Sequence, residues 1–205
     1  MANAAKTTKA FFYGTLMHPK ILTRVIGNDG THLEICPAVL KDFTRHKVKR
    51  EEYPGIVPFP QSKEKLFKGR DDLPQEDRSV RGTLVTGLTV RDMRLLDFFE
   101  GTEYARDPVK VHPFISIASH SLEFKSLVPS QPPPLPEDSE LLQAIDAETY
   151  VFSELDKLEP SPWDFANFVE HNSWKWYGAA ANDNEYVAEV DRRRERGEHE
   201  MGNNL

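Results

Sequence analysis

Residues 89–106 have the sequence TVRDMRLLDFFEGTEYAR, and this stretch decides much of the fold. Thr89 is a good helix cap, and Asp92 follows three residues later in a capping-box-like start. Apolar side chains then recur at helical spacing, at Met93, Leu96 and Phe99. Gly101 is typical of the position just beyond a helix end. The stretch therefore predicts an amphipathic helix that begins after Thr89 and ends before Gly101.

Glu100, the last residue of this predicted helix, is the strongest candidate for chemistry. It is flanked by an aromatic residue and a glycine. Desolvation by aromatic surface and the negative end of the helix dipole both raise the pKa of a carboxyl group. A carboxyl group with a raised pKa can take and return a proton, as a general acid–base must. The alternative is a solvated acid at a helix end. Arg106 either pairs with Glu103 or Asp97 or orients a substrate, and we favour the pairing.

A second candidate follows the apolar run at residues 10–13, which predicts a buried strand that stops at Gly14. A glycine lets the chain turn there and approach a ligand closely. Backbone N–H groups released from the strand can hold a carboxylate or a developing oxyanion. A plain turn would show the same residues, so the pattern alone leaves both interpretations open.

Further β signals occur along the chain. Short apolar runs and alternating patterns predict strands at residues 38–49, 79–87, 109–111 and 149–152. Short helices are predicted at residues 19–26, between Pro19 and Gly27, and at residues 163–169. Many strands with a few short helices indicate an α+β domain built on a compact β-barrel.

Composition limits the class of protein. The chain has 205 residues, 39% of them hydrophobic and 29% charged, with a formal net charge of −7. Nucleic-acid binding depends mostly on phosphate neutralisation, so this acidic balance argues against it. The single cysteine, Cys36, rules out an internal disulfide and a cysteine-based zinc cage, and we expect a packed thiol. No stretch approaches the roughly 18 apolar residues of a membrane span, and the first residues lack a signal-peptide pattern. We therefore expect a cytoplasmic protein.

Irregular blocks flank this core. We expect a flexible N-terminus at residues 1–9, a charged excursion at about residues 61–78 and a proline-rich excursion at about residues 115–146. Residues 171–205 form a C-terminal extension, helical or disordered. Its arginine run at residues 192–194 has acidic neighbours, which favours a solvated face over a binding patch.

Several motifs, in order along the chain, resemble those of the gamma-glutamylcyclotransferase-like superfamily, in particular its AIG2-like branch. Tyr13-Gly14-Thr15-Leu16 is similar to the YGTL signature of that family, and residues 53–58 (YPGIVP) to its central segment. Residues 82–84 resemble the following strand, and residues 96–106 the LDxFEGxEYxR block. Residues 148–152 and 163–165 resemble the last strand and a terminal WDF turn. The resemblance covers residues 11–169, and the two excursions and the tail depart from it.

This resemblance implies an α+β fold, a small mixed β-barrel with flanking short helices, within residues 10–170. It implies that a γ-glutamyl group is cyclised to 5-oxoproline with release of an amine. The substrate's own amine attacks the γ-carbonyl, so neither protein nucleophile, metal nor cofactor is needed. Glu100 would be the general acid–base, and backbone N–H groups of residues 14–17 would hold the oxyanion. The substrate-binding residues would be Tyr13, Gly14, Thr15, Leu16, Met17, His18, Tyr53 and Tyr104.

We expect a monomer whose partner is a small-molecule γ-glutamyl substrate, without nucleic acid or membrane. The competing hypothesis is a non-catalytic γ-glutamyl or amino-acid binding module, or an interaction scaffold, on the same barrel. An intact Glu100 favours the enzyme, because a binding-only site has no need of a poised acid–base. The identity of the amine leaving group depends on the excursions that shape its pocket.

Overall fold

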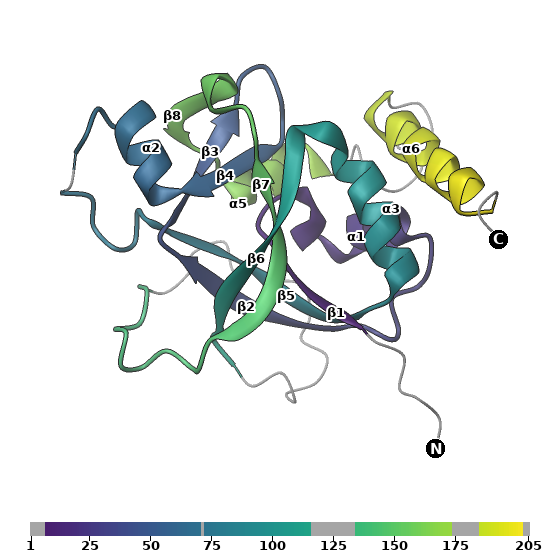
Figure 1. Cartoon of the computed structure of the whole chain (residues 1–205), viewed down its shortest axis with the longest axis horizontal. Coiled ribbons are helices and arrows are strands. Elements are labelled where there is room, and N and C mark those ends of the chain that lie inside the picture. Colours follow the sequence, from purple (N-terminus) through teal and green to yellow (C-terminus); the bar gives the residue numbers. More distant parts are fainter. Residues whose placement is uncertain (1–6, 71, 116–133, 174–184, 203–205) are drawn as a thin grey trace.

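A closed barrel of five strands forms the centre of the computed structural model, which describes residues 7–70, 72–115, 134–173 and 185–202. The strand order is β1 (Thr8–Phe12), β5 (Ser79–Leu88), β2 (Glu34–Lys41), β6 (Tyr104–Pro113) and β7 (Ile145–Phe152) (Figure 1). Adjacent strands are antiparallel, except that β1 closes the barrel by pairing in parallel with β7. The predicted small mixed barrel is confirmed.

A second sheet of three strands stands beside the barrel, in the order β4 (Pro54–Pro58), β3 (Phe43–Val48) and β8 (Leu158–Pro162). The prediction of one long strand at residues 38–49 is wrong. Asp42 adopts a left-handed backbone conformation, with φ of 59°, and its carbonyl accepts a hydrogen bond from the N–H of Phe59 at 2.8 Å. The chain therefore leaves the barrel at the end of β2 and enters the second sheet as β3.

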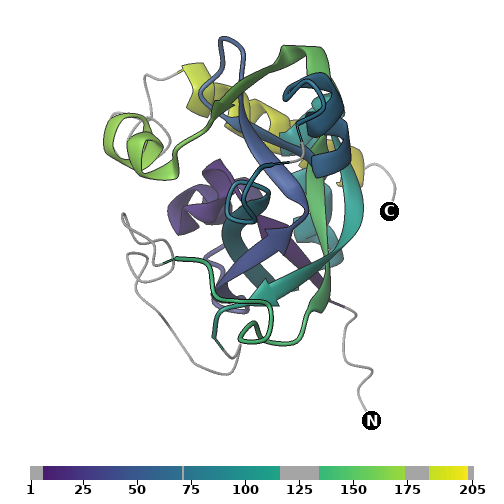
Figure 2. The ribbon, with the colours of Figure 1, turned by 90° about the vertical axis from the view of Figure 1, so that its left-hand side faces the viewer.

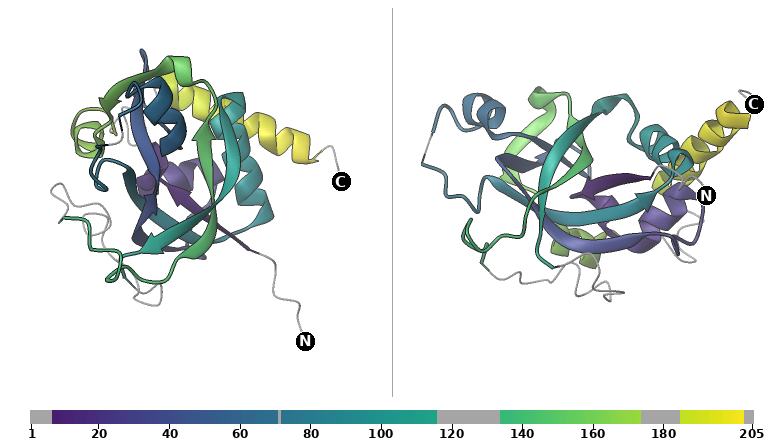
Figure 3. Two further views of the ribbon diagram at one scale, coloured as in Figure 1. Left: turned by 60° about the vertical axis from the view of Figure 1, so that its left-hand side comes forward. Right: turned by 60° about the horizontal axis from the view of Figure 1, so that its bottom comes forward.

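Three helices cover one side of the barrel: α1 (Pro19–Ile26), α3 (Val90–Glu100) and α6 (Glu185–Gly202). The helices predicted at residues 19–26 and after Thr89 are confirmed. In Figures 1 and 3, α6 lies alongside α3 on the outside of the molecule. Figure 2 looks onto the opposite side, where α2 (Phe59–Lys65) follows β4 and α5 (Phe165–His171) follows β8. Part of the expected charged excursion at residues 61–78 is thus helical.

Beside a small hydrophobic cluster around Phe152 and Leu158, two larger clusters fill the domain. One joins α1 and α3 to the barrel and includes Ile21, Leu22, Leu88 and Leu96, each at most 1% exposed. The other lies among the barrel strands around Phe11, Leu84 and Val111. Cys36 belongs to this second cluster, and burial raises the pKa of its thiol to about 11. The thiol is therefore packed and protonated, as expected from the sequence.

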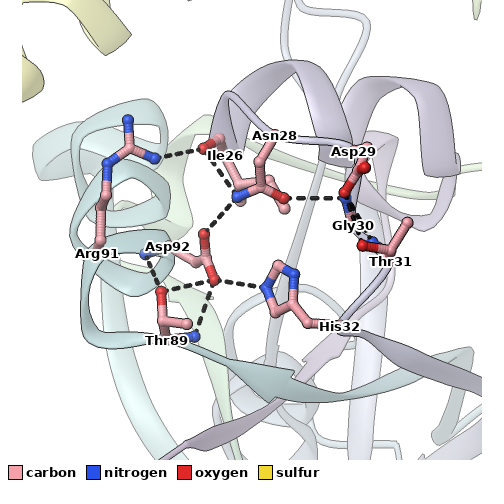
Figure 4. A network of polar contacts seen from close by, with 9 residues as sticks. All are labelled: Ile26, Asn28, Asp29, Gly30, Thr31, His32, Thr89, Arg91 and Asp92. Atoms are coloured by element: carbon pink, nitrogen blue, oxygen red, sulfur yellow. Dashed lines mark hydrogen bonds and ion pairs between the residues drawn. The ribbon is translucent and has the colours of Figure 1, made fainter.

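The N-terminus of α3 is held by the polar network of Figure 4, which is centred on the buried carboxylate of Asp92. The predicted capping box is present, because Asp92 accepts a hydrogen bond from the N–H of Thr89 at 2.9 Å while the Thr89 hydroxyl accepts from the N–H of Asp92 at 3.1 Å. The amide of Asn28 and the ring of His32 reach the same carboxylate at 2.9 and 3.0 Å. Burial opposes ionisation of Asp92, but these hydrogen bonds outweigh it and lower its pKa. The loop after α1 thereby fixes where α3 starts.

The remaining boundaries are close to expectation. β1 begins at Thr8, so the end of the expected N-terminal segment belongs to the barrel, while residues 1–6 lie outside the described residues. Most of the proline-rich excursion, residues 116–133, also lies outside them. Within the described part of the chain, no helix has the length and apolar character needed to cross a membrane.

Candidate active site

A cavity of about 350 Å³ opens where the end of β1, the start of β4 and the C-terminal end of α3 meet. Its wall is largely aromatic and includes Tyr13, Tyr53, Tyr104 and Tyr150. Three of these tyrosines, all but Tyr150, are predicted site residues. The other predicted site residues that line the cavity are Glu100, Gly14, Thr15 and Leu16. Segments far apart in the sequence therefore meet in one cavity, which has the size of a small-molecule site.

Glu100 is the last residue of α3 and faces this aromatic cavity. Desolvation by burial raises the pKa of its carboxyl group to about 8, Arg193 opposes this by attraction, and Asp97 and Glu103 add repulsion. The next residue, Gly101, has φ of 67°, which favours glycine and turns the chain away into β6. Near neutral pH the carboxyl group can therefore exchange a proton with a bound molecule.

The backbone turn after β1 forms the opposite wall. Gly14 packs against Pro54 so closely that an added Cβ would lie 2.9 Å from its Cγ atom. A 3-10 helix at residues 15–17 follows, and among the described residues the N–H groups of Thr15 and Leu16 have no backbone acceptor. Both residues line the cavity. Two N–H donors are thus available to an anionic or carbonyl oxygen.

The last two residues of the predicted substrate-binding run, Met17 and His18, do not line this cavity. The N–H of Met17 donates to the carbonyl of Gly14 at 3.0 Å, so it is not available as an oxyanion donor, and the side chain packs in the core. His18 caps α1, where its Nδ1 accepts from the N–H of Lys20 at 3.3 Å. Burial lowers the pKa of His18 to about 4, which keeps this acceptor nitrogen unprotonated.

A set of hydrogen bonds and ion pairs holds the tyrosine side chains that line the cavity near Glu100. The Tyr13 hydroxyl donates to the carbonyl of Tyr150 at 2.6 Å, and the Tyr150 hydroxyl donates to Asp97 at 2.8 Å. Arg106 pairs with Asp97 at 3.2 Å and with Glu148 at 2.8 Å. The favoured structural pairing of Arg106 is therefore present, with Asp97 as the partner. The sequence does not identify Tyr150 as a site residue, because nothing in a β-strand pattern shows which side chain faces a cavity.

Arg45 is a further residue that the sequence did not reveal. It lies in β3, where its Nη1 donates to the carbonyl of Tyr13 at 2.8 Å, and its guanidinium is 5.4 Å from the ring centre of Trp163. Burial lowers the pKa of Arg45 to about 10, so it remains a cation near neutral pH. This buried charge ties the second sheet to the residue that precedes the Gly14 turn.

The other end of the cavity is acidic. Tyr53 donates to Glu103 at 3.3 Å, and Tyr104 donates to the carbonyl of Pro54 at 2.9 Å. Glu51 also lines this end, and burial together with repulsion from Glu103 raises its pKa. The two predicted tyrosines thus brace the cavity through their hydroxyl groups.

Arg193 brings α6 into the site. It lines the cavity, and its Nη1 donates to the carbonyl of Phe99 at 2.7 Å. Its neighbour Arg194 donates to the carbonyl of Arg24 at 3.3 Å. The interpretation of residues 192–194 as a solvated arginine run is therefore wrong for two of the three residues. The balance of charges along the sequence could not predict these contacts, because it does not show which side of a helix faces a pocket.

Known proteins share this sequence pattern. The family model described as "Gamma-glutamyl cyclotransferase, AIG2-like" matches residues 10–175. AIG2-like protein C of Arabidopsis thaliana is 27% identical over 163 residues, which are 79% of this chain and 69% of that protein. AIG2-like protein B of the same plant is 30% identical over 101 residues, which are 49% of this chain and 48% of that protein. The chain thus spans between about half and seven tenths of the length of these relatives.

Two solved structures align with most of this chain. A solution structure of an Arabidopsis thaliana protein aligns with a TM-score of 0.49 at 20% identity, over 92% of this chain and 94% of that one. A yeast gamma-glutamyl cyclotransferase specific to glutathione aligns with a TM-score of 0.46 at 11% identity, over 93% and 96% of the two chains. The family match covers nearly all of the barrel and the cavity residues from Phe11 to Tyr150, and the chain belongs to the AIG2-like gamma-glutamyl cyclotransferase family.

Proposed function

We propose that this protein is a γ-glutamyl cyclotransferase, which converts a γ-glutamyl amide into 5-oxoproline and a free amine. The observation that carries the proposal is the position of Glu100, whose pKa is raised to about 8 in an aromatic cavity that also presents two backbone N–H groups. Membership of the family supports the same reaction class.

In the proposed mechanism, Glu100 takes a proton from the substrate's α-ammonium group. The freed amine attacks the γ-carbonyl carbon of the same molecule, which closes a five-membered ring and needs no protein nucleophile. The carbonyl oxygen becomes an oxyanion, which the N–H groups of Thr15 and Leu16 stabilise. Protonated Glu100 then returns its proton to the leaving nitrogen as the C–N bond breaks. The ring nitrogen gives its second proton to the regenerated Glu100 carboxylate, which passes it to the released amine. The tyrosine wall and Arg45 hold the turn and the carboxyl group in position.

The raised pKa of Glu100 suits both the uptake and the return of the proton. A carboxylate with an ordinary pKa would be a weak base toward an ammonium group, and its protonated form would be scarcely populated near neutral pH. When the pKa of the carboxyl group lies near the operating pH, the ionised form is a stronger base and the protonated form is also populated. Burial is the main cause of the shift, and the attraction of Arg193 limits it.

The test is a panel of γ-glutamyl dipeptides, glutathione and γ-glutamyl-lysine, with 5-oxoproline measured as the product. Glu100→Gln keeps the size of the side chain and removes the exchangeable proton, so we expect turnover to fall by about 10²- to 10⁴-fold. Glu64→Gln removes an exposed carboxylate in α2 and serves as the matched control, with unchanged turnover.

Full activity of Glu100→Gln on a substrate that the wild type turns over would contradict the mechanism. Binding of γ-glutamyl compounds without 5-oxoproline release, across the whole panel, would favour the binding module instead. Thermal-shift measurements in parallel separate these two outcomes, because they report binding whether or not turnover occurs.

A further inference from the structure

We propose that α6 is part of the active site and that Arg193 binds the α-carboxylate of the γ-glutamyl group. This inference rests on the proposed function. Arg193 lies in α6, beyond residues 10–175, so it is outside the range that the family model matches. It is also the one positively charged side chain among the described residues that line the cavity.

The position of Arg193 is fixed by the docking of α6. Asp191 forms two hydrogen bonds with Arg24 of α1, at 3.1 and 2.6 Å. At Gly197 the helix approaches Phe98 of α3 so closely that an added Cβ would lie 2.5 Å from the ring. These contacts lie on either side of Arg193 in the sequence. Helix α6 is thus held against α1 and α3 on both sides of Arg193, which fixes the position of the guanidinium.

Geometry brings this guanidinium next to the catalytic carboxyl group. Arg193 donates to the carbonyl of Phe99, the residue before Glu100, and a Cβ built on Gly101, the residue after it, would lie 3.5 Å from Nη1. The charge of Arg193 also lowers the pKa of Glu100 against the effect of burial. A cation and a proton-accepting carboxyl group therefore stand side by side at the end of α3.

A γ-glutamyl group is complementary to this pair. It carries an ammonium and a carboxylate on the same carbon atom, and the proposed mechanism sets the ammonium at Glu100. Its carboxylate is then repelled by Glu100, Glu103 and Glu51, the acidic residues of the wall, and attracted by Arg193. A guanidinium matches a carboxylate in geometry as well as charge. Arg193 would therefore select substrates that keep the α-carboxylate.

The experiment measures binding in the Glu100→Gln background, where turnover is blocked and Arg193 cannot act through the titration of Glu100. Two ligands are compared: the n-butylamide of γ-glutamate, and the n-butylamide of 4-aminobutyrate, which lacks only the α-carboxylate. Adding Arg193→Gln should weaken binding of the first ligand about 10- to 100-fold and that of the second less than about 2-fold. Arg193→Lys, which keeps the charge, should recover part of the loss.

Arg192→Gln is the matched control, because Arg192 is the preceding residue of α6 and is exposed. It should leave both affinities unchanged. Circular dichroism and thermal melting check that each variant keeps its fold. Equal affinity of the first ligand with and without Arg193→Gln overturns this inference alone, as does an equal loss for both ligands. Wild-type protein that neither binds nor turns over any γ-glutamyl compound of the panel overturns the proposed function as well.

Discussion

At the scale of single residues, Glu100 lowers the stability of the folded protein but has a pKa suited to proton transfer. Its carboxyl group is partly removed from water by aromatic side chains, and two further acids lie close enough to repel its charge. A carboxyl group with a raised pKa destabilises the folded state whenever the unfolded chain would ionise it. Active sites often retain such groups because the reaction needs the shifted pKa.

The stability of Glu100→Gln should therefore depend on pH in a defined way. The pKa of Glu100 rises from an ordinary value of 4.5 to about 8 on folding, so the folded state binds the proton more tightly. Wild-type stability thus falls relative to the variant as pH rises from about 4.5 to 8, and is flat beyond. Because the side chain is only half-buried, we expect a difference on the order of 2–4 kcal/mol at pH 8, measured by urea unfolding.

The comparison contains its own control, since the two proteins should have nearly equal stability at about pH 3, where the carboxyl group is protonated in both states. Glu64→Gln should follow the wild type at every pH. A constant difference between Glu100→Gln and the wild type from pH 4.5 to 8 would mean that the carboxyl group titrates normally in the folded protein.

At the scale of elements, α3 is the part that carries the site, and its two ends are held differently. Polar contacts from the loop after α1 meet at Asp92 near the start, whereas Arg193 of α6 contacts the carbonyl of Phe99 at the end. The capping box could be predicted because it is local in sequence. The contacts of Asn28 and His32 could not, since they join residues about 60 positions apart.

Asp92→Ala should show the energetic importance of this network. The change removes the buried acceptor shared by Thr89, Asn28 and His32, and so breaks the contacts that meet at this carboxylate. Loss of a helix cap and of these partners should together lower the free energy of unfolding by about 2–4 kcal/mol, measured by urea titration. Arg94→Ala, an exposed position of the same helix, should change it by less than about 0.5 kcal/mol. Similar losses in the two variants would refute a special role for Asp92.

At the scale of the whole molecule, the barrel and the second sheet meet where β4 crosses β7. Gly55 of β4 lies so close to Phe152 of β7 that an added Cβ would be 2.7 Å from its Cβ and 3.0 Å from a methyl carbon of Leu158. The adjoining residues, Tyr53 and Pro54, line the cavity. Packing between the sheets therefore determines the shape of the site.

Gly55→Ala should accordingly separate the two sheets slightly. Overpacking against the ring of Phe152 should lower the free energy of unfolding by about 1–3 kcal/mol and shift the thermal midpoint downward. Lys47→Ala, at an exposed position of the neighbouring strand β3, is the control and should leave the midpoint nearly unchanged. A Gly55→Ala protein as stable as the wild type would show that the junction can adjust without strain.

The sequence by itself determined the features that depend on neighbouring residues: helix α3 with its capping box, helix α1 between Pro19 and Gly27, and the acid at the end of an apolar helix. The tertiary structure decided what depends on distant residues. Asp42 divides an apparently continuous strand because its backbone is left-handed. This conformation is rare for a residue other than glycine, so the residue type does not predict it. Arg45 and Arg193 reach the site from another sheet and from a helix beyond the family core. Periodicity shows which residues share a face, whereas only packing shows what that face meets.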